Sequence, residues 1–234
     1  MLSTSSSIAS NLQRVREQIA DAAQRCGRAP EEITLVGVSK VQPADLVVEA
    51  IRAGLEHVGE NRVQEAAPKF AAVRQAIGDS LHPRFHMVGH LQTNKVGQAL
   101  STFDCIDSVD SLHLAEALNR RATTVVPVLL EVYVGDDPDR PGFRLEGIED
   151  EVGRMLELPN LRVQGLMSVA PLEGDARAAF AQVRRLRENL AQRYPRVHFG
   201  VLSMGMSEDY GLAIEEGSTQ VRIGTALFGP RKAR

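Results

Sequence analysis

Lys40 stands directly after the apolar stretch ITLVGVS, which covers residues 33–39. The chain has 27 basic residues and only four are lysines, namely Lys40, Lys69, Lys95 and Lys232, and Lys40 alone ends so apolar a run. A partly desolvated lysine has a lowered pKa because its charged form loses hydration, and its neutral amine can form a Schiff base with an aldehyde. The alternative is a lysine that reaches from a strand end into solvent. Position alone favours neither interpretation.

A second candidate site is the segment LSMGMSEDYGLAIEEGSTQVRIGTALFG near the end of the chain. Ser203, Gly205, Gly224 and Thr225 supply hydroxyl groups and approachable backbone N–H groups of the kind that bind phosphate. The alternative is that glycine and serine only form turns here. Together with Lys40, these loops indicate a ligand with an aldehyde at one end and a phosphate at the other. Pyridoxal 5′-phosphate (PLP) is such a cofactor.

Arg222 precedes Gly224 by two residues, so on a strand both side chains would face the same way. An inward-facing arginine could reach the pyridine nitrogen of PLP. Because a guanidinium keeps its protons, it would donate a hydrogen bond without protonating the ring, which makes the cofactor a weak electron sink. The competing interpretation is a salt bridge at the rim to Glu215 or Glu216.

The elements that must position these residues alternate between apolar strand runs and helical runs. Residues 7–27 have apolar positions at helical spacing and predict an opening amphipathic helix. Further helices are predicted over residues 43–54, 111–122, 146–158 and 175–194. Strands are predicted over residues 33–40, around residue 58, and over residues 84–91, 103–109, 125–134, 162–170, 198–205 and 220–229.

This alternation predicts a parallel sheet, because each helix returns the chain over the sheet face. Eight units favour a single closed (β/α)8 TIM barrel over residues 1–234, with an extra N-terminal helix and a flexible segment at residues 1–7. The alternative is an open doubly wound sheet, but the sequence has no GxGxxG or GxxxxGK motif.

In a parallel barrel the chemistry lies at the carboxyl ends of the strands. We therefore expect a crown of polar residues around the barrel mouth, together with the methionines of the sixth and seventh strand ends. Its members are Lys40, Glu60, Asn61, His90, Asp107, Ser108, Met167, Ser168, Ser203, Met204, Gly205, Arg222, Gly224 and Thr225.

The composition and charge of the chain argue against two classes of binding partner. The net charge is −3 and the pI is near 6.1, which gives no indication of nucleic acid or an anionic membrane as a partner. No apolar run approaches the roughly 18 residues of a membrane span, and the first residues do not resemble a signal peptide. We expect a cytoplasmic protein. Cys26 and Cys105 are isolated and predicted to be reduced thiols, with Cys105 in the core.

The segments LVGVSKVQP, HVGENRVQEAAPK, FHMVGHLQTNKV, SVDS, GLMSVAP and SMGMSEDYGLAIEEGSTQVRIGTALFG resemble, in order, the signature segments of the pyridoxal phosphate homeostasis protein family. The resemblance covers nearly the whole chain after the first helix, and its longest motif is highly specific. It implies a monomeric or weakly associating barrel similar to the N-terminal domain of alanine racemase. It also implies a carrier or regulator of the vitamin B6 pool, with PLP-dependent apo-enzymes as candidate recipients and no established catalytic turnover.

For individual residues, the resemblance implies that Lys40 carries PLP as a Schiff base and that Arg222 faces the pyridine nitrogen. Ser203, Gly224 and Thr225 would hold the phosphate. Asn61 would lie beside the ring, and we also expect Met167, Met204 and Gly205 to border the cofactor.

The alternative function is a fold-type III PLP enzyme such as an amino-acid racemase. Racemisation requires acid and base groups on both faces of the substrate, commonly a lysine and a tyrosine from a second domain. The chain ends soon after the predicted eighth strand, so Tyr133, Tyr194 or Tyr210 would have to serve, and each is more simply a packing or surface residue. We therefore favour storage and transfer over turnover.

Other motifs predict no site. His86 and His90 are four residues apart, but on a strand that spacing does not bring two imidazoles onto one metal. The aspartates of GDDPDR lack the pattern of a calcium loop, and RRLREN and NRRA are typical of exposed helix faces. A barrel without a ligand, serving only as an interaction module, would make Lys40 and the phosphate-like loops coincidental.

Overall fold

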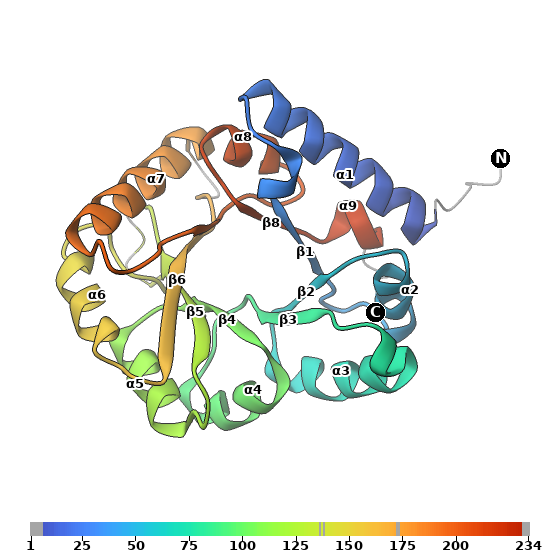
Figure 1. Ribbon diagram of the computed structural model, residues 1–234, viewed down its shortest axis with the longest axis horizontal. Helices are drawn as coiled ribbons and strands as arrows, with labels where there is room; N and C mark the ends of the chain where they lie inside the picture. Colours follow the sequence, from blue (N-terminus) through green and yellow to red (C-terminus); the bar gives the residue numbers. More distant parts are fainter. Residues whose placement is uncertain (1–6, 136, 138, 172–173, 231–234) are drawn as a thin grey trace.

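The computed structural model describes residues 7–135, 137, 139–171 and 174–230 of the chain. Eight parallel strands close into one barrel in the order β1 to β8, with β8 paired to β1. Figure 1 looks along this barrel, and the helices surround the strands. The predicted (β/α)8 fold is confirmed.

The elements follow the predicted alternation of strands and helices. The strands are β1 Thr34–Val38, β2 His57–Glu60, β3 Arg84–Met87, β4 Cys105–Val109, β5 Val126–Val132, β6 Leu161–Ser168, β7 Val201–Ser203 and β8 Gln220–Ile223. The helices are α1 Ile8–Arg25, α2 Ala44–Arg52, α3 Val63–Ile77, α4 Val96–Thr102, α5 Leu112–Arg121, α6 Ile148–Leu156, α7 Ala176–Arg193, α8 Tyr210–Glu215 and α9 Thr225–Phe228.

The extra helix α1 covers the barrel beside the junction of β8 and β1, where it contacts α8 and α9 (Figure 1). Its apolar positions Leu12, Val15 and Ile19 are buried, as the helical spacing predicts. Ser7 is the N-cap, since its hydroxyl oxygen accepts the N–H of Ser10. The remainder of the predicted flexible segment lies outside the described residues.

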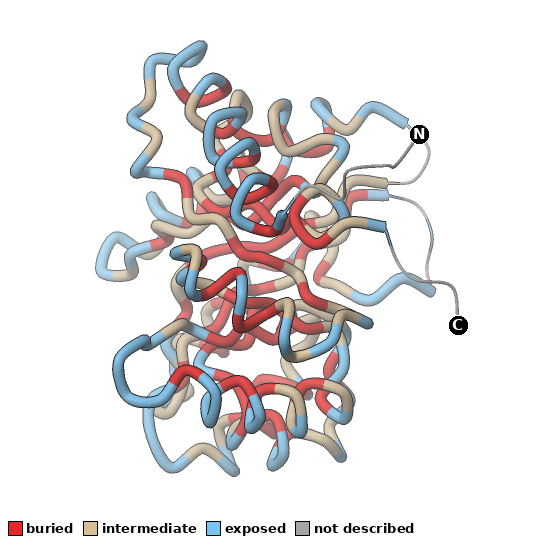
Figure 2. The backbone as a smooth tube through the Cα atoms, turned by 90° about the vertical axis from the view of Figure 1, so that its right-hand side faces the viewer, coloured by how far each residue is buried: buried red, intermediate tan, exposed pale blue. Residues whose placement is uncertain are grey.

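The strands bury both of their faces, and the two faces differ in polarity. Outward residues such as Val58, Ile106 and Leu166 pack under the helices in the main apolar core. Inward residues include polar groups that bond to one another across the barrel, such as Asp107 and Gln220. Figure 2 shows the buried segments in the middle of the molecule and the exposed segments around it. The barrel therefore has an apolar outer layer and a partly polar interior.

Several predicted strands are too long, among them the third, which ends at Met87, and the seventh, which covers only Val201–Ser203. The first ends at Val38, so Lys40 lies two residues beyond it rather than at its last position. The eighth ends at Ile223, and its predicted continuation forms α9. The carbonyl oxygen of Gly224 accepts the N–H groups of Leu227 and Phe228, which starts the helix and buries both side chains. Short apolar runs do not distinguish such a turn of helix from a strand.

The two cysteines are free thiols, and Cys105 is buried as predicted. Burial raises the pKa of the Cys105 thiol to about 12. Within the described ranges, no helix has the length and apolar character that a membrane span requires. The same part of the chain contains no cluster of three potential metal ligands.

Candidate functional site

A cavity of about 370 Å³ opens at the carboxyl ends of the strands. It lies where the carboxyl ends of β1, β2, β3, β6, β7 and β8 and the segments after them converge, which is the functional end of a (β/α)8 barrel. Its lining consists of Val38, Lys40, Gln42, Asn61, Val88, Val169, Met206, Ser207, Glu208, Asp209, Arg222, Gly224, Thr225 and Gly229. Five of the nine predicted cofactor residues line it, namely Lys40, Asn61, Arg222, Gly224 and Thr225.

Lys40 enters the cavity from a tight turn after β1. The N–H of Gln42 donates to the carbonyl oxygen of Ser39 at 3.0 Å, which closes the turn around Lys40. Val41 has φ of 59° and an exposed side chain, an unfavourable conformation for a β-branched residue. Backbone strain of this kind persists only where the surrounding structure enforces it. The turn therefore presents Lys40, which is partly buried, in one direction.

Glu60 and Lys69 fix the residue before Lys40 from outside the barrel. Glu60 is fully buried, and its Oε1 accepts the Ser39 hydroxyl at 2.7 Å and the Lys69 ammonium at 2.6 Å. The ammonium also donates to the Ser39 carbonyl oxygen at 2.8 Å. Because Lys69 belongs to α3, Glu60 faces this helix and not the barrel mouth. Glu60 thus ends β2 as predicted, but its side chain does not contribute to the cavity.

Arg222 forms part of the cavity wall from β8. Its Nη1 donates to the Ser203 carbonyl oxygen at 2.7 Å and to the Ser203 hydroxyl at 2.8 Å, and its Nη2 donates to the Ser168 carbonyl oxygen at 2.8 Å. Arg222 is buried, so the proposed rim salt bridge to Glu215 or Glu216 is wrong. Those two glutamates pair with surface arginines on α1 and α7.

The loops after β7 and β8 form the side of the cavity where phosphate was expected. Gly224 and Thr225 come from the start of α9, and the segment Met206–Asp209 approaches from the loop before α8. Asp209 Oδ1 accepts the N–H of Met206 at 2.6 Å and fixes this loop. Residues 206–209 belong to the candidate segment that begins at Leu202, but none of them is among the predicted cofactor residues. The signal for them is the SED segment, where an aspartate can bond to the backbone of its own turn.

Asn61 and three valines complete the wall around Lys40. Asn61 follows β2, Val38 ends β1, and Val88 and Val169 directly follow β3 and β6; the three valines add apolar surface. Gly89 backs Asn61 so closely that a Cβ at this position would lie 2.4 Å from the Asn61 carbonyl oxygen. The glycine therefore permits the approach of Asn61 to the cavity.

Four predicted cofactor residues lie behind the cavity and not in its lining. Ser203 is fully buried and bonds to Arg222. Met204 belongs to the apolar core, and Met167 is buried on β6. Gly205 has φ of 91°, and its carbonyl oxygen accepts the N–H of Arg222. Their role as direct cofactor contacts stays a prediction, whereas Ser203 and Gly205 support Arg222 in this structure.

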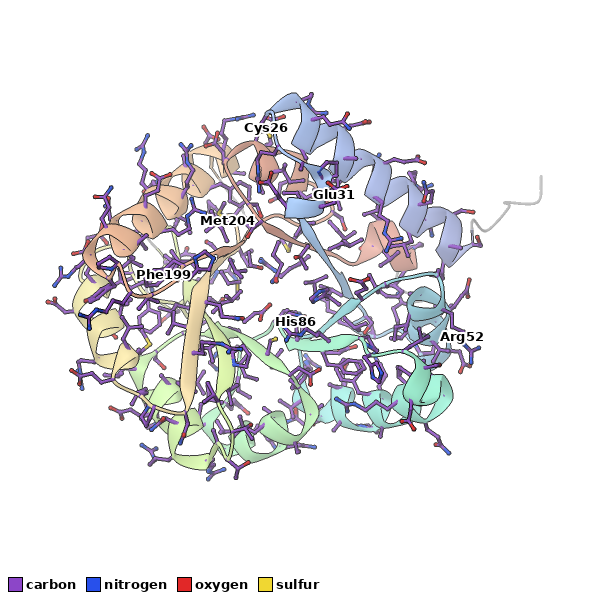
Figure 3. The ribbon with its side chains drawn as sticks, in the orientation of Figure 1. Cys26, Glu31, Arg52, His86, Phe199 and Met204 are labelled. Carbon is purple, nitrogen blue, oxygen red and sulfur yellow. The ribbon has the colours of Figure 1, made fainter. Side chains whose placement is uncertain are left out.

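Other crown members lie deep in the barrel or outside the cavity. Asp107 is buried in the barrel interior, where it bonds to His86 at 3.0 Å (Figure 3 labels His86 on β3). His90 is exposed and bonds to Asp110 at 2.7 Å. The two histidines thus have different carboxylate partners.

Glu131 adds an unusual carboxyl group to the interior. Burial, followed by the charge of Asp110, raises the pKa of Glu131 to about 7, against the opposing effect of Arg222. Its Oε2 is buried and has no hydrogen-bond partner within the described part of the chain. At neutral pH both the protonated and the ionised form of this carboxyl are therefore populated.

A larger hollow of about 970 Å³ lies at the opposite, amino-terminal end of the strands. Among the described residues that line it, the cationic side chains are those of Arg162 and Arg196, together with the titratable His198. A guanidinium does not form a Schiff base, so this hollow does not fit an aldehyde ligand. The cavity of about 370 Å³ at the carboxyl ends, in contrast, contains Lys40.

Comparison with known families and structures identifies relatives of this chain. The family described as "Alanine racemase, N-terminal domain" matches residues 10–232. The Pyridoxal phosphate homeostasis protein of Escherichia coli strain K12 is 40% identical over 230 residues, which cover 96% of this chain and 97% of that protein. The protein of the same name from Aquifex aeolicus is 42% identical over 227 residues, covering 94% and 97%.

Solved structures show the same barrel. The structure of PipY from Synechococcus elongatus PCC7942 with PLP bound has a TM-score of 0.83 and 38% identity, and the match covers 95% of this chain and all of that one. An alanine racemase from Clostridium difficile 630 has a TM-score of 0.73 at 14% identity and covers 95% of this chain and 57% of its own length. The latter likeness concerns the fold alone.

Proposed function

We propose that this chain, which belongs to the pyridoxal phosphate homeostasis protein family, binds PLP in the cavity at the carboxyl ends of its strands and acts in vitamin B6 homeostasis. One observation carries the proposal: an amine, a guanidinium and two glycine- and hydroxyl-containing loops converge on one cavity of about 370 Å³. Relatives named for PLP homeostasis and a PLP-bound structure of PipY support the identity of the ligand.

The residues present fit the chemistry of this cofactor. Lys40 would hold the aldehyde carbon as a Schiff base, since it is the lysine of the cavity lining. Thr225 and Gly224 would bind the phosphate, and Ser207 on the facing loop adds a hydroxyl group. PLP when bound supplies an electrophilic aldehyde and a conjugated ring.

Arg222 would donate to the pyridine nitrogen. Its three protein hydrogen bonds use three of five N–H donors, so two remain for a ligand. Because the guanidinium keeps its protons, Arg222 would leave the ring nitrogen unprotonated, and the bound cofactor would stabilise carbanions poorly. Asn61 and the valines of the wall would flank the ring.

Storage and transfer fit the surroundings of the cavity better than racemisation does. The Tyr210 hydroxyl donates to Gln18 on α1, and the Tyr194 hydroxyl donates to the carbonyl oxygen of Glu149. Tyr133 packs beneath the guanidinium groups of two arginines. None of the three tyrosines is among the described residues of the cavity lining, so none of them is placed to act as the second proton-transfer group of a racemase.

The test is the visible absorbance of the purified protein after PLP addition, followed by borohydride reduction and peptide mass mapping. We expect a yellow protein whose reduced adduct maps to Lys40, and a Lys40→Ala variant that forms no adduct but retains some PLP noncovalently. Lys95→Ala is the matched control and should behave as wild type. A protein that takes up no PLP, or an adduct at another lysine, would contradict the proposal.

A turnover assay separates carrier from enzyme. The PLP-loaded protein should racemise no amino acid at a rate above free PLP, while it delivers PLP to an added apo-enzyme. Rapid racemisation would favour the enzyme alternative. Three statements about the protein stay predictions. They are that apo-enzymes receive PLP from it, that it is a monomer and that it lies in the cytoplasm.

A further inference from the structure

Arg222 carries a buried charge that is balanced indirectly. Within the described part of the chain, its guanidinium donates only to the uncharged oxygens of Ser203 and Ser168. A buried charge without a partner is costly, so some negative group must compensate it. Burial lowers the pKa of Arg222, and the charge of Asp107 is the first of the effects that oppose this.

Gln220 provides the bonded connection between Asp107 and Arg222. Its Nε2 donates to Asp107 Oδ2 at 2.8 Å and to the Ser203 hydroxyl oxygen at 2.9 Å. The Ser203 oxygen thus accepts from both Gln220 and Arg222. Gln220 and Arg222 are alternate residues of β8, so both point into the barrel.

Asp107 is in turn held from the opposite side. His86 Nδ1 lies 3.0 Å from the same Oδ2, and His86 Nε2 lies 2.9 Å from Nδ1 of His57. Burial lowers the pKa of His57 to about 4, so this end of the network is neutral at neutral pH. A His86 ring that donates from Nδ1 can accept at Nε2 from His57, which satisfies both nitrogens of His86. The network therefore crosses the barrel interior from β2 to the cavity wall.

We infer that Gln220 is a positioning residue for the cofactor: through its two bonds to Asp107 and Ser203, it fixes the guanidinium of Arg222 in the orientation that meets the pyridine ring. The inference rests on the proposed function, which makes PLP the ligand of Arg222. Gln220 does not line the cavity at the carboxyl ends, so its effect on PLP is exerted through Arg222. A purely space-filling role would be met equally by leucine.

The first test needs no cofactor. In the unliganded protein, nitrogen NMR of the arginine side chains should show a resolved, slowly rotating guanidinium for Arg222, assigned by its loss in Arg222→Met. In Gln220→Leu this signal should broaden or average, whereas exposed Gln192→Leu on α7 should leave it unchanged. An unchanged Arg222 signal in a folded Gln220→Leu protein overturns the inference.

The second test uses the PLP-loaded protein. Gln220→Leu should bind PLP about tenfold more weakly, the effect of losing one charge-linked hydrogen bond. Its visible absorption band should shift toward that of Arg222→Met. The double variant Gln220→Leu/Arg222→Met should be no worse than Arg222→Met alone. Additive losses, or wild-type affinity and spectrum for Gln220→Leu, overturn the inference.

A second variant keeps the inference testable if Gln220→Leu does not fold. Ser203→Ala removes only the oxygen that Gln220 and Arg222 share, and it should produce the same NMR and spectral changes. Wild-type behaviour of a folded Ser203→Ala protein counts against the inference. If the wild-type protein binds no PLP, the proposed function fails, while the NMR test still decides whether Gln220 fixes Arg222.

Discussion

The ammonium group of Lys69 lies 2.8 Å from the backbone carbonyl oxygen of Ser39, the residue that precedes Lys40. The same ammonium lies 2.6 Å from Glu60 Oε1, which also accepts the Ser39 hydroxyl. Glu60 has an exposed fraction of 0%, and its Oε2 has no hydrogen-bond partner in the described structure. A buried ion pair on α3 and β2 therefore holds the strand end from which the candidate PLP lysine projects.

Replacing Lys69 by methionine should destabilise the protein strongly, because it leaves a buried carboxylate without its cation. We expect Lys69→Met to lower the free energy of unfolding by about 3–5 kcal/mol. The double variant Glu60→Gln/Lys69→Met should regain most of this loss, since it removes both charges. Urea unfolding followed by circular dichroism measures each value. A loss below about 1 kcal/mol for Lys69→Met would show that the pair is not a buried charge pair.

Val41 offers a test of the strained turn around Lys40. Its φ of 59° costs a β-branched residue about 1–3 kcal/mol, and its side chain is 51% exposed, so little burial is lost on truncation. Val41→Gly should therefore raise the free energy of unfolding by about 1 kcal/mol after the entropic cost of glycine. It should weaken PLP binding about two- to fivefold, because Lys40 becomes less preorganised.

Val125 is the matched control for Val41. It is similarly exposed, at 53%, and is not among the described residues with positive φ. Val125→Gly should lower stability by about 0.5–1 kcal/mol and leave PLP affinity unchanged. Denaturant unfolding and absorbance titration with PLP measure both quantities. A Val41→Gly protein that is less stable than wild type would refute the strain argument.

Gly89 tests the position of Asn61. A Cβ on Gly89 would lie 2.4 Å from the Asn61 carbonyl oxygen and 2.7 Å from its Cα, and backbone atoms cannot rotate away. Gly89→Ala should displace Asn61, reduce PLP affinity about tenfold or more, and destabilise the fold by about 1–3 kcal/mol. Absorbance titration and denaturant unfolding measure the two effects.

Gly211→Ala on α8 is the control for Gly89→Ala. A Cβ there meets no atom within 4 Å, so the change should raise stability slightly, by less than about 1 kcal/mol, and leave PLP binding unchanged. If Gly89→Ala binds PLP as tightly as the control, the close contact does not determine the position of Asn61.

Alternating apolar runs were sufficient to predict the barrel, because each strand buries both faces and each helix has an apolar stripe. Lys40, Asn61, Arg222, Gly224 and Thr225 could be assembled at one mouth since the ends of parallel strands meet there. Predicting which residues meet at the mouth requires only approximate strand ends. The predicted first and eighth strands are too long, but this did not change the residues assigned to the mouth.

The inward polar network could not be predicted in the same way. Asp107 lies in β4 and Gln220 in β8, and no local pattern in either strand shows that the two side chains bond across 113 residues of sequence. The outward direction of Glu60 also depends on Lys69, whose approach is set by the packing of α3. Tertiary contacts decide these positions, and spacing alone does not.

Glu131 makes stability depend on pH in a defined window. Its pKa rises from 4.5 to about 7 on folding because burial disfavours the charged carboxylate. Between these two values the unfolded chain is ionised while the folded protein still binds the proton. The contribution of Glu131 to the free energy of unfolding is therefore fully present below pH 4.5, and it is lost as the pH rises to about 7. The loss is about 1–3 kcal/mol, allowing for the partial exposure of the side chain.

Glu131→Gln removes this ionisation, so the variant should gain stability relative to wild type as the pH increases through the window and then keep a constant advantage. Urea unfolding at several pH values measures the difference between the two proteins. Glu157→Gln, an exposed position just after α6, should show no such change in the same series. A Glu131→Gln difference that stays constant from pH 4.5 to about 8 would mean that Glu131 ionises equally easily in both states. The expected sign is the reverse of that for a salt-bridged carboxylate, because here folding favours the protonated form.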